Sequence, residues 1–150
     1  MKLISKILLF SLVFSFLQEG ISQTYDKDYT VNYINDHVES SCKLFAEKKN
    51  LRIEYYSNGE ALRMDYIFPE TIDLENGVTF NKEEGALILS CYDKAGKCIE
   101  RDIIKRDSKI LYERSNLPMT CTDCDGTTEA MKHLIMLYLD KKHTRDTPFE

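Results

Sequence analysis

The sequence lacks the features that would divide it into several parts. It has no tryptophan, three prolines and six glycines among 150 residues, and it contains no internal repeat or low-complexity tract. No Pro- or Gly-rich linker interrupts it, and compact domains run to roughly 100–150 residues. We therefore expect one domain, long enough to bury a core of its own.

A surplus of positive charge is also missing. The chain has 20 Lys and Arg against 25 Asp and Glu, a formal net charge of −5 at pH 7, with the two signs interspersed. Nucleic-acid binding requires a basic face, and binding to anionic lipid requires a polybasic segment. The sequence therefore predicts no nucleic-acid partner and no membrane-surface partner.

The sequence signatures of common catalytic sites are absent as well. There is no G-x-S-x-G elbow, no phosphate-binding glycine loop, no H-E-x-x-H motif and no H-x-x-x-H pair. Carboxylates such as Asp65, Glu70, Asp73 and Glu75 are too numerous for spacing to single out a catalytic pair. We expect no cofactor and no metal, and the sequence gives no reason to expect an enzyme.

What is present begins with a segment that has the layout of a secretory signal peptide. Lys2 and Lys6 precede an apolar run over residues 7–17, and residues 20–22 form a small-x-small end. The run is too short for a membrane span, which needs about 20 apolar residues. We expect residues 1–22 to be a signal peptide and residues 23–150 to be one secreted domain, periplasmic or extracellular, with an ordered core of about 29–142.

Two segments of this domain have helical periodicity. In residues 30–45 a capping Thr30 precedes an apolar stripe. The stripe consists of Val31, Ile34, Val38, Cys42 and Phe45. Residues 127–142 have a broad apolar face. The last turn of this segment carries Lys141 and Lys142, whose charge interacts favourably with the helix dipole. The sequence predicts one helix over each segment.

Between residues 51 and 68 the period changes to two around Asn58-Gly59. Asn-Gly between alternating runs is the strongest short-range hairpin signal. The cross-strand pairs predicted from a two-residue turn are Tyr55 with Leu62, Ile53 with Met64 and Leu51 with Tyr66. All three apolar pairs would then lie on one face of the hairpin.

Further strands are predicted over residues 78–81, 86–92, 98–104 and 109–114, with turn residues between them. Glu83 and Glu84 fall in one of these turns and have the character of a solvated pair. Short connections imply an antiparallel meander. The predicted fold class is α+β, with an N-terminal helix, a meander of about six strands forming an open barrel or bent sheet, and a C-terminal helix packed on it.

Five cysteines follow the signal segment, at Cys42, Cys91, Cys98, Cys121 and Cys124. Export predicts disulfides, and an odd number leaves at least one thiol unpaired. If Tyr92 pairs with Lys97, Cys91 and Cys98 lie directly opposite each other and can form a clip. A free thiol pair or another connectivity remains open, and zinc is disfavoured because the C-x6-C spacing is wider than usual.

Cys121 and Cys124 form a C-x-x-C motif just ahead of the last helix. A helix dipole lowers the pKa of a nearby thiol and so permits thiol–disulfide exchange. Asp123 and Asp125 oppose this by charge repulsion, and two residues, Asp125 and Gly126, would separate the motif from the helix. We expect a structural disulfide here, with redox activity as the alternative. Cys42 is the candidate for an unpaired buried thiol, with a disulfide to the sheet as its alternative.

Three short motifs carry a resemblance to known proteins. They are Tyr33-Ile34-Asn35, Cys91…Cys98-Ile99 and Ala130…His133-Leu134-Ile135. In these the chain resembles uncharacterised small secreted proteins of Bacteroidota type, a resemblance that implies no activity. The order of the predicted elements is similar to that of pleckstrin-homology-like domains, which implies a bent antiparallel sheet capped by the C-terminal helix.

Taken together, these features predict an exported, non-enzymatic binding or interaction domain of unknown ligand, stabilised by disulfides. The partner would be a protein, a peptide or a small apolar ligand, contacted by Tyr and Phe side chains of the sheet face. A dimer through Cys42 is a further possibility. The alternative function is that of a periplasmic thiol–disulfide protein acting through Cys121 and Cys124.

Overall fold

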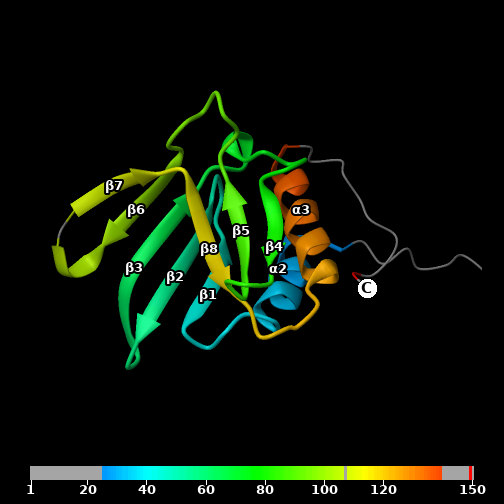
Figure 1. The fold of residues 1–150 in the computed structure, drawn as a ribbon, viewed down its shortest axis with the longest axis horizontal. Helices are drawn as coiled ribbons and strands as arrows, with labels where there is room; N and C mark the ends of the chain where they lie inside the picture. The colour runs from blue at the N-terminus through cyan, green and yellow to red at the C-terminus, as the bar shows by residue number, and fades with distance from the viewer. Residues whose placement is uncertain (1–24, 107, 140–148, 150) are drawn as a thin grey trace, which may run out of the picture.

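A computed structural model of the chain describes residues 25–106, 108–139 and 149 (Figure 1). The predicted signal peptide, residues 1–22, and the basic pair Lys141 and Lys142 lie outside these residues. No helix within the described ranges is long and apolar enough to cross a membrane. The fold is α+β with a helix at each end of a run of strands, as the sequence predicts.

Two α-helices and eight strands make up the described part of the chain. The helices are α2 (Lys27–Asn35) and α3 (Asp125–Leu139). The strands are β1 (Cys42–Ala46), β2 (Leu51–Ser57), β3 (Glu60–Ile67), β4 (Val78–Asn81), β5 (Ala86–Ser90), β6 (Ile99–Ile103), β7 (Ser108–Tyr112) and β8 (Arg114–Pro118). Two short 3-10 turns, η1 (Pro69–Thr71) and η2 (Ile104–Arg106), follow β3 and β6.

The antiparallel strands are divided between two sheets. The larger has the order β1-β2-β3-β6-β7 and the smaller the order β4-β5-β8. β7 passes into β8 through the single residue Glu113, so the sheets meet at a corner (Figure 1). On the other side α2 packs against β1 and α3, and α3 packs against β4. The two helices thus bridge the sheet edges β1 and β4, and the apolar core lies between them and the sheets.

The first helix is shorter than the periodicity predicted. It begins after Asp26, whose side chain accepts a hydrogen bond from the Tyr29 N–H, and not at Thr30. It ends at Asn35, whose side-chain amide bonds both the N–H and the C=O of Leu44, at 2.9 Å each. Residues 42–46 are therefore strand β1, in which Cys42 and Leu44 point into the core. Apolar residues at Cys42 and Phe45 have the spacing of one helix face. The structure instead buries Cys42 and Leu44, the spacing of two that is typical of a strand.

The hairpin turn is present, but all three predicted cross-strand pairs are wrong, because the expected register holds only for Ser57 with Glu60 and Tyr56 with Ala61 next to the turn. Asn58 and Gly59 have φ of 53° and 81°, as a two-residue type I′ turn requires. A bulge between Tyr55 and Tyr56 then shifts the pairing by one residue. Ile53 consequently lies opposite Asp65 and not opposite Met64. A one-residue slip exchanges the two faces of a strand, so Asp65 points into the interior.

Two further corrections concern the strands after the hairpin. The predicted strand over residues 109–114 is divided between β7 and β8, which belong to different sheets. The strands on either side of Cys91 and Cys98 are not a hairpin either, because β5 lies in the smaller sheet and β6 in the larger. Cys91 instead forms an isolated bridge with Ile72.

Candidate anion-binding site

The most densely bonded polar side chain in the described fold is Asp65, on β3. Its carboxylate is 0% exposed and receives a bidentate ion pair from Arg101, with Nε–Oδ1 at 2.7 Å and Nη2–Oδ2 at 2.8 Å. The Ser115 hydroxyl donates to Oδ2 at 2.6 Å. A buried carboxylate is tolerated when it is paired and fully hydrogen-bonded, which is the case here.

A second guanidinium, that of Arg63, approaches the same carboxylate from β3 itself. Its Nη2 donates to Oδ2 at 3.2 Å. Its Nε lies 3.1 Å from Oδ1, within ion-pair distance, yet the N–H is misaligned and has no hydrogen-bond acceptor among the described residues. Both arginines stack on tyrosine rings, Arg63 on Tyr55 at 3.7 Å and Arg101 on Tyr112 at 4.0 Å. Stacking and ion pairing together fix the direction in which each guanidinium points.

Tyr55 extends this network to the smaller sheet. Its hydroxyl donates to the Asn116 C=O at 2.7 Å and lies 2.9 Å from the Ser115 oxygen. Burial, together with the negative charge of Asp65, raises the pKa of Tyr55 to about 12, so the phenol stays neutral. Burial lowers the pKa of Arg101, but its hydrogen bond to Asp65 and the charge of that carboxylate outweigh this and raise the pKa overall. Side chains thus join β3 and β6 to β8, whose backbone pairs with β5 in the smaller sheet.

The outer side of the network is a cavity of about 240 Å³ at the corner between the sheets. We call it the arginine pocket; its walls are Arg63, Arg101, Tyr112, Arg114 and Asn116. Three guanidinium groups surround the pocket, and the buried carboxylate of Asp65 neutralises one of their three positive charges. Arginine forks match the geometry of carboxylate and phosphate groups, so a pocket of this kind favours an anion. It lies in a chain whose overall charge is negative.

A larger groove of about 470 Å³ runs between β4 and the first turns of α3. Charges of both signs line it, including Lys82 and Asp125, and Glu129 pairs with Lys132 at 3.2 Å. Because these charges offset one another, the groove shows no preference for a ligand of either sign. No group of three or more His, Cys, Asp or Glu side chains within the described ranges is placed to hold a metal ion.

Cys91 and Cys98 form a disulfide, with their Cα atoms 5.9 Å apart. The bond does not clip a hairpin as the sequence predicted. It ties the end of β5 in the smaller sheet to the residue before β6 in the larger, and the Cys91 N–H donates to Glu113 C=O at the corner. The disulfide therefore holds together the two sheets that carry the walls of the arginine pocket.

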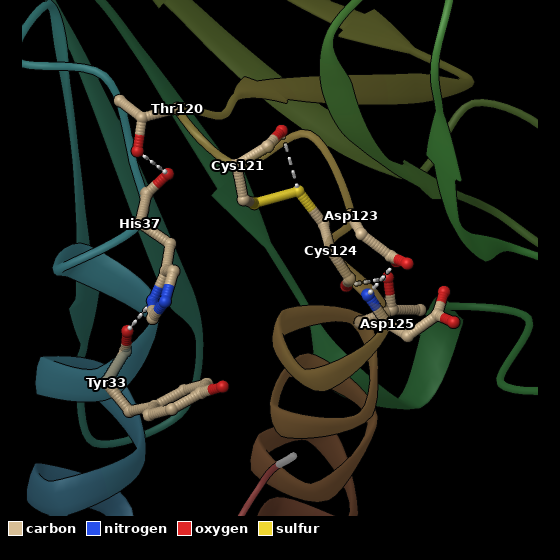
Figure 2. Close-up of a disulfide and its surroundings, with 8 residues drawn as sticks. Tyr33, His37, Thr120, Cys121, Asp123, Cys124 and Asp125 are labelled. Carbon is tan, nitrogen blue, oxygen red and sulfur yellow. Dashed lines mark hydrogen bonds between the residues drawn. A yellow bond between two sulfur atoms is a disulfide. The ribbon is translucent and has the colours of Figure 1, made fainter.

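Cys121 and Cys124 are also bonded to each other, in the loop that leads into α3 (Figure 2). Sequence reasoning separated this motif from the helix, but α3 begins at Asp125, and the Cys124 C=O accepts the Thr128 N–H at 2.8 Å. Cys124 is thus the N-cap, and it is buried. Thr120, the residue before Cys121, bonds the segment that follows α2. The N–H and the hydroxyl of Thr120 both donate to the His37 C=O (Figure 2).

Cys42 is the free cysteine of the described chain and is buried. Burial raises the pKa of its thiol, which disfavours the reactive thiolate. Its side chain points from β1 into the core and takes part in neither disulfide.

Sequence reasoning missed every wall of the arginine pocket. Asp65 was one carboxylate among many, and the predicted register placed its neighbours Met64 and Tyr66 inside instead. The available signal was Arg63-x-Asp65, two opposite charges at a spacing of two, which places both on one face of the strand. Comparisons with protein families, with curated proteins and with solved structures find no match for the chain. The function proposed below therefore rests on the geometry of this chain alone.

Proposed function

We propose that this chain is an exported, non-enzymatic binding domain that holds an anionic ligand in the arginine pocket. One observation carries the proposal. Asp65, itself inaccessible, fixes Arg63 and Arg101 beside a cavity that Arg114 borders from the other sheet. Donors that are immobile before binding lose little side-chain entropy when an anion arrives, and this favours affinity.

The residues around the pocket support binding rather than catalysis. Tyr55 has a pKa of about 12 and donates to a main-chain carbonyl, so it is not available as a base near neutral pH. The Ser115 hydroxyl donates to Asp65, whose oxygens already receive both arginines. Tyr55 and Ser115 therefore stabilise the site, and the guanidinium groups remain as the donors that a ligand can contact.

Two features support export. The chain begins with a segment of signal-peptide layout, and the described part contains two disulfides. Disulfides persist in oxidising compartments and are rare in the cytosol. A disulfide between the two pocket-bearing sheets also suits a protein that must keep its site intact outside the cell.

The test is an NMR titration of the isotope-labelled exported chain with acetate, phosphate and sulfate, at constant ionic strength with chloride as reference. We expect saturable shifts at the guanidinium Nε–H signal of Arg114. The R114Q variant should weaken binding several-fold, because Arg114 is a partly exposed wall residue whose loss leaves the buried network intact. R106Q is the matched control, since Arg106 is exposed and lies outside the pocket. Equal effects of the two substitutions would contradict the proposal.

A second candidate function is thiol–disulfide exchange through Cys121 and Cys124. The observation in its favour is that Cys124 is the N-cap of α3, where the dipole stabilises a thiolate. Its burial and the neighbouring Asp123 and Asp125 act against it. Measuring the reduction potential of this pair decides the question. A value of about −270 to −120 mV indicates exchange, and one below about −300 mV indicates a structural bridge.

A further inference from the structure

The rim of the arginine pocket already holds a carboxylate, and it comes from the chain itself. Glu84, in the turn between β4 and β5, accepts a hydrogen bond from the Asn116 side chain at 2.6 Å. Its other oxygen accepts a hydrogen bond from the Asn81 side chain at 3.1 Å and lies 3.5 Å from Arg114 Nη2. Arg114 and Asn116 are both walls of the pocket. The rim is therefore built with donors that a carboxylate can bridge.

The two carboxylates of this region differ in how firmly they are held. Asp65 is 0% exposed and bonded to two arginines and a serine, and breaking such a buried pair is strongly destabilising. The Glu84 and Arg114 side chains are 35% and 56% exposed, and exposed ion pairs contribute little to stability. An incoming anion can therefore replace Glu84 beside Arg114 and Asn116, but it cannot replace the buried Asp65.

We propose that the ligand of the arginine pocket is a monoanionic carboxylate that displaces Glu84 from Arg114 and Asn116. This rests on the proposed function and specifies its ligand class. Glu84 then acts as a tethered competitor, which keeps the rim donors paired while the pocket is empty of ligand and lowers its apparent affinity. The ligand carboxylate binds Arg114 and Asn116 in place of Glu84 and contacts the guanidinium groups of Arg63 and Arg101.

The rim donors and the size of the cavity support this ligand class. Arg114 and Asn116 already accommodate one carboxylate, that of Glu84, so a ligand carboxylate that displaces it meets donors placed for the same group. The cavity of about 240 Å³ is larger than a carboxylate group and has room for a few further atoms. Both a small organic acid and the C-terminal carboxylate of a peptide meet these requirements.

The turn that carries Glu84 is held mainly by groups other than the Glu84 side chain, whose one bond within the turn is from the Asn81 side-chain amide at 3.1 Å. The Asn81 side-chain oxygen accepts the N–H groups of Glu83 and Glu84, at 2.9 and 3.2 Å. Gly85, at φ +60°, completes the turn with a conformation that few other residues adopt. Substitution of Glu84 is therefore expected to leave the turn folded. Glu83, next to it, is exposed and has no bond to the pocket, so E83Q removes the same charge from almost the same place.

The experiment titrates the disulfide-bonded exported chain and its E84Q and E83Q variants with propionate, triglycine, triglycine amide and phosphate at constant ionic strength. E84Q should tighten propionate or triglycine binding by about two- to fivefold, the equivalent of one exposed ion pair. E83Q should change it little, and triglycine amide should not bind. Preference for triglycine over propionate would identify the source as a peptide C-terminus, and the reverse a small acid.

Three results overturn the inference in distinguishable ways. Binding of phosphate alone, lost in R114Q, contradicts the carboxylate assignment but leaves the proposed function standing. Equal tightening in E84Q and E83Q shows a general charge effect and contradicts displacement of Glu84. If no probe binds to the chain or to E84Q, both the inference and the proposed function are wrong.

Discussion

Asp65 and Arg101 are direct cross-strand partners on β3 and β6, and the guanidinium of one meets both carboxylate oxygens of the other. The pair exists because a bulge in the neighbouring hairpin turns Asp65 inward. Ser115 from the smaller sheet then bonds the same carboxylate. One buried carboxylate thus both joins the two sheets and fixes the arginines of the candidate site.

Replacement of Asp65 by asparagine should destabilise the fold severely. D65N leaves Arg101 and Arg63 facing an uncharged group inside the protein, and breaking a buried ion pair costs about 3–5 kcal/mol. The free energy of unfolding, measured in urea, should fall by that amount. D102N is the control, because Asp102 is a half-buried neighbour of Arg101 on β6 whose loss should cost less than about 1 kcal/mol. A D65N protein as stable as D102N would mean that the network contributes little to folding.

The raised pKa of Tyr55 makes stability depend on pH in the alkaline range. The phenol titrates at about 12 in the folded chain against an ordinary value of 10.0, so the native state holds this proton more strongly. The contribution is fully present below pH 10 and is lost as pH rises through 12, because the unfolded chain deprotonates first. Its size is about 2–3 kcal/mol. In urea unfolding between pH 9 and 12, Y55F should show a shallower decline than the unsubstituted chain; parallel declines would contradict this.

The same substitution should be costly at neutral pH. Y55F removes the donor to the Asn116 C=O and the contact with Ser115, and a buried acceptor left without its partner costs about 1–3 kcal/mol. Y56F is a suitable comparison, since Tyr56 is the next residue on β2 and its hydroxyl donates to Glu54 on the same strand, not to the smaller sheet. The difference in unfolding midpoint between Y55F and Y56F measures how much the link between the sheets contributes.

The parts of the fold that sequence could predict are those set by local chemistry. The turn at Asn58 and Gly59 was predictable because both residues tolerate the positive φ that it needs. The end of α2 was not, because the side chain of Asn35 bonds the backbone of Leu44 nine residues further on. Apolar residues over a short segment satisfy helix and strand periods alike, and the contact with β1 decided between them.

The candidate site was less predictable than the fold for the same reason. Asp65 is buried because Arg101 and Ser115, 36 and 50 residues away in sequence, meet it there. The predicted register paired apolar residues with one another, which is the better choice when only two strands are considered. The third strand, β6, supplies the charge that makes the other register acceptable. The Arg63-x-Asp65 spacing alone does not show that Arg101 and Arg114 lie beside it, so the pocket follows only once β6 and β8 are placed.

Removal of the Cys91–Cys98 disulfide should weaken both stability and anion binding. In the loop-entropy account, closing a loop of this length contributes about 2–3 kcal/mol, and closing the shorter Cys121–Cys124 loop about 2 kcal/mol. The two double substitutions, C91S/C98S and C121S/C124S, should therefore differ little in urea unfolding. They should differ in binding, because only the first loosens the two sheets that line the pocket. Equal loss of binding in both variants would show that the pocket responds to global stability alone.

Cys42 should be unreactive until the chain unfolds. Its thiol is buried and its pKa is raised by that burial, so at pH 8 little thiolate is present or accessible. Intact mass after alkylation should show no added group on the native exported chain, one group in denaturant, and four more after reduction. Alkylation of the native chain at Cys42 would mean that β1 opens readily, and two or more groups in denaturant without reduction would mean that a disulfide is open. A disulfide-linked dimer through Cys42 would give twice the mass before reduction, and this experiment tests that prediction on the same sample.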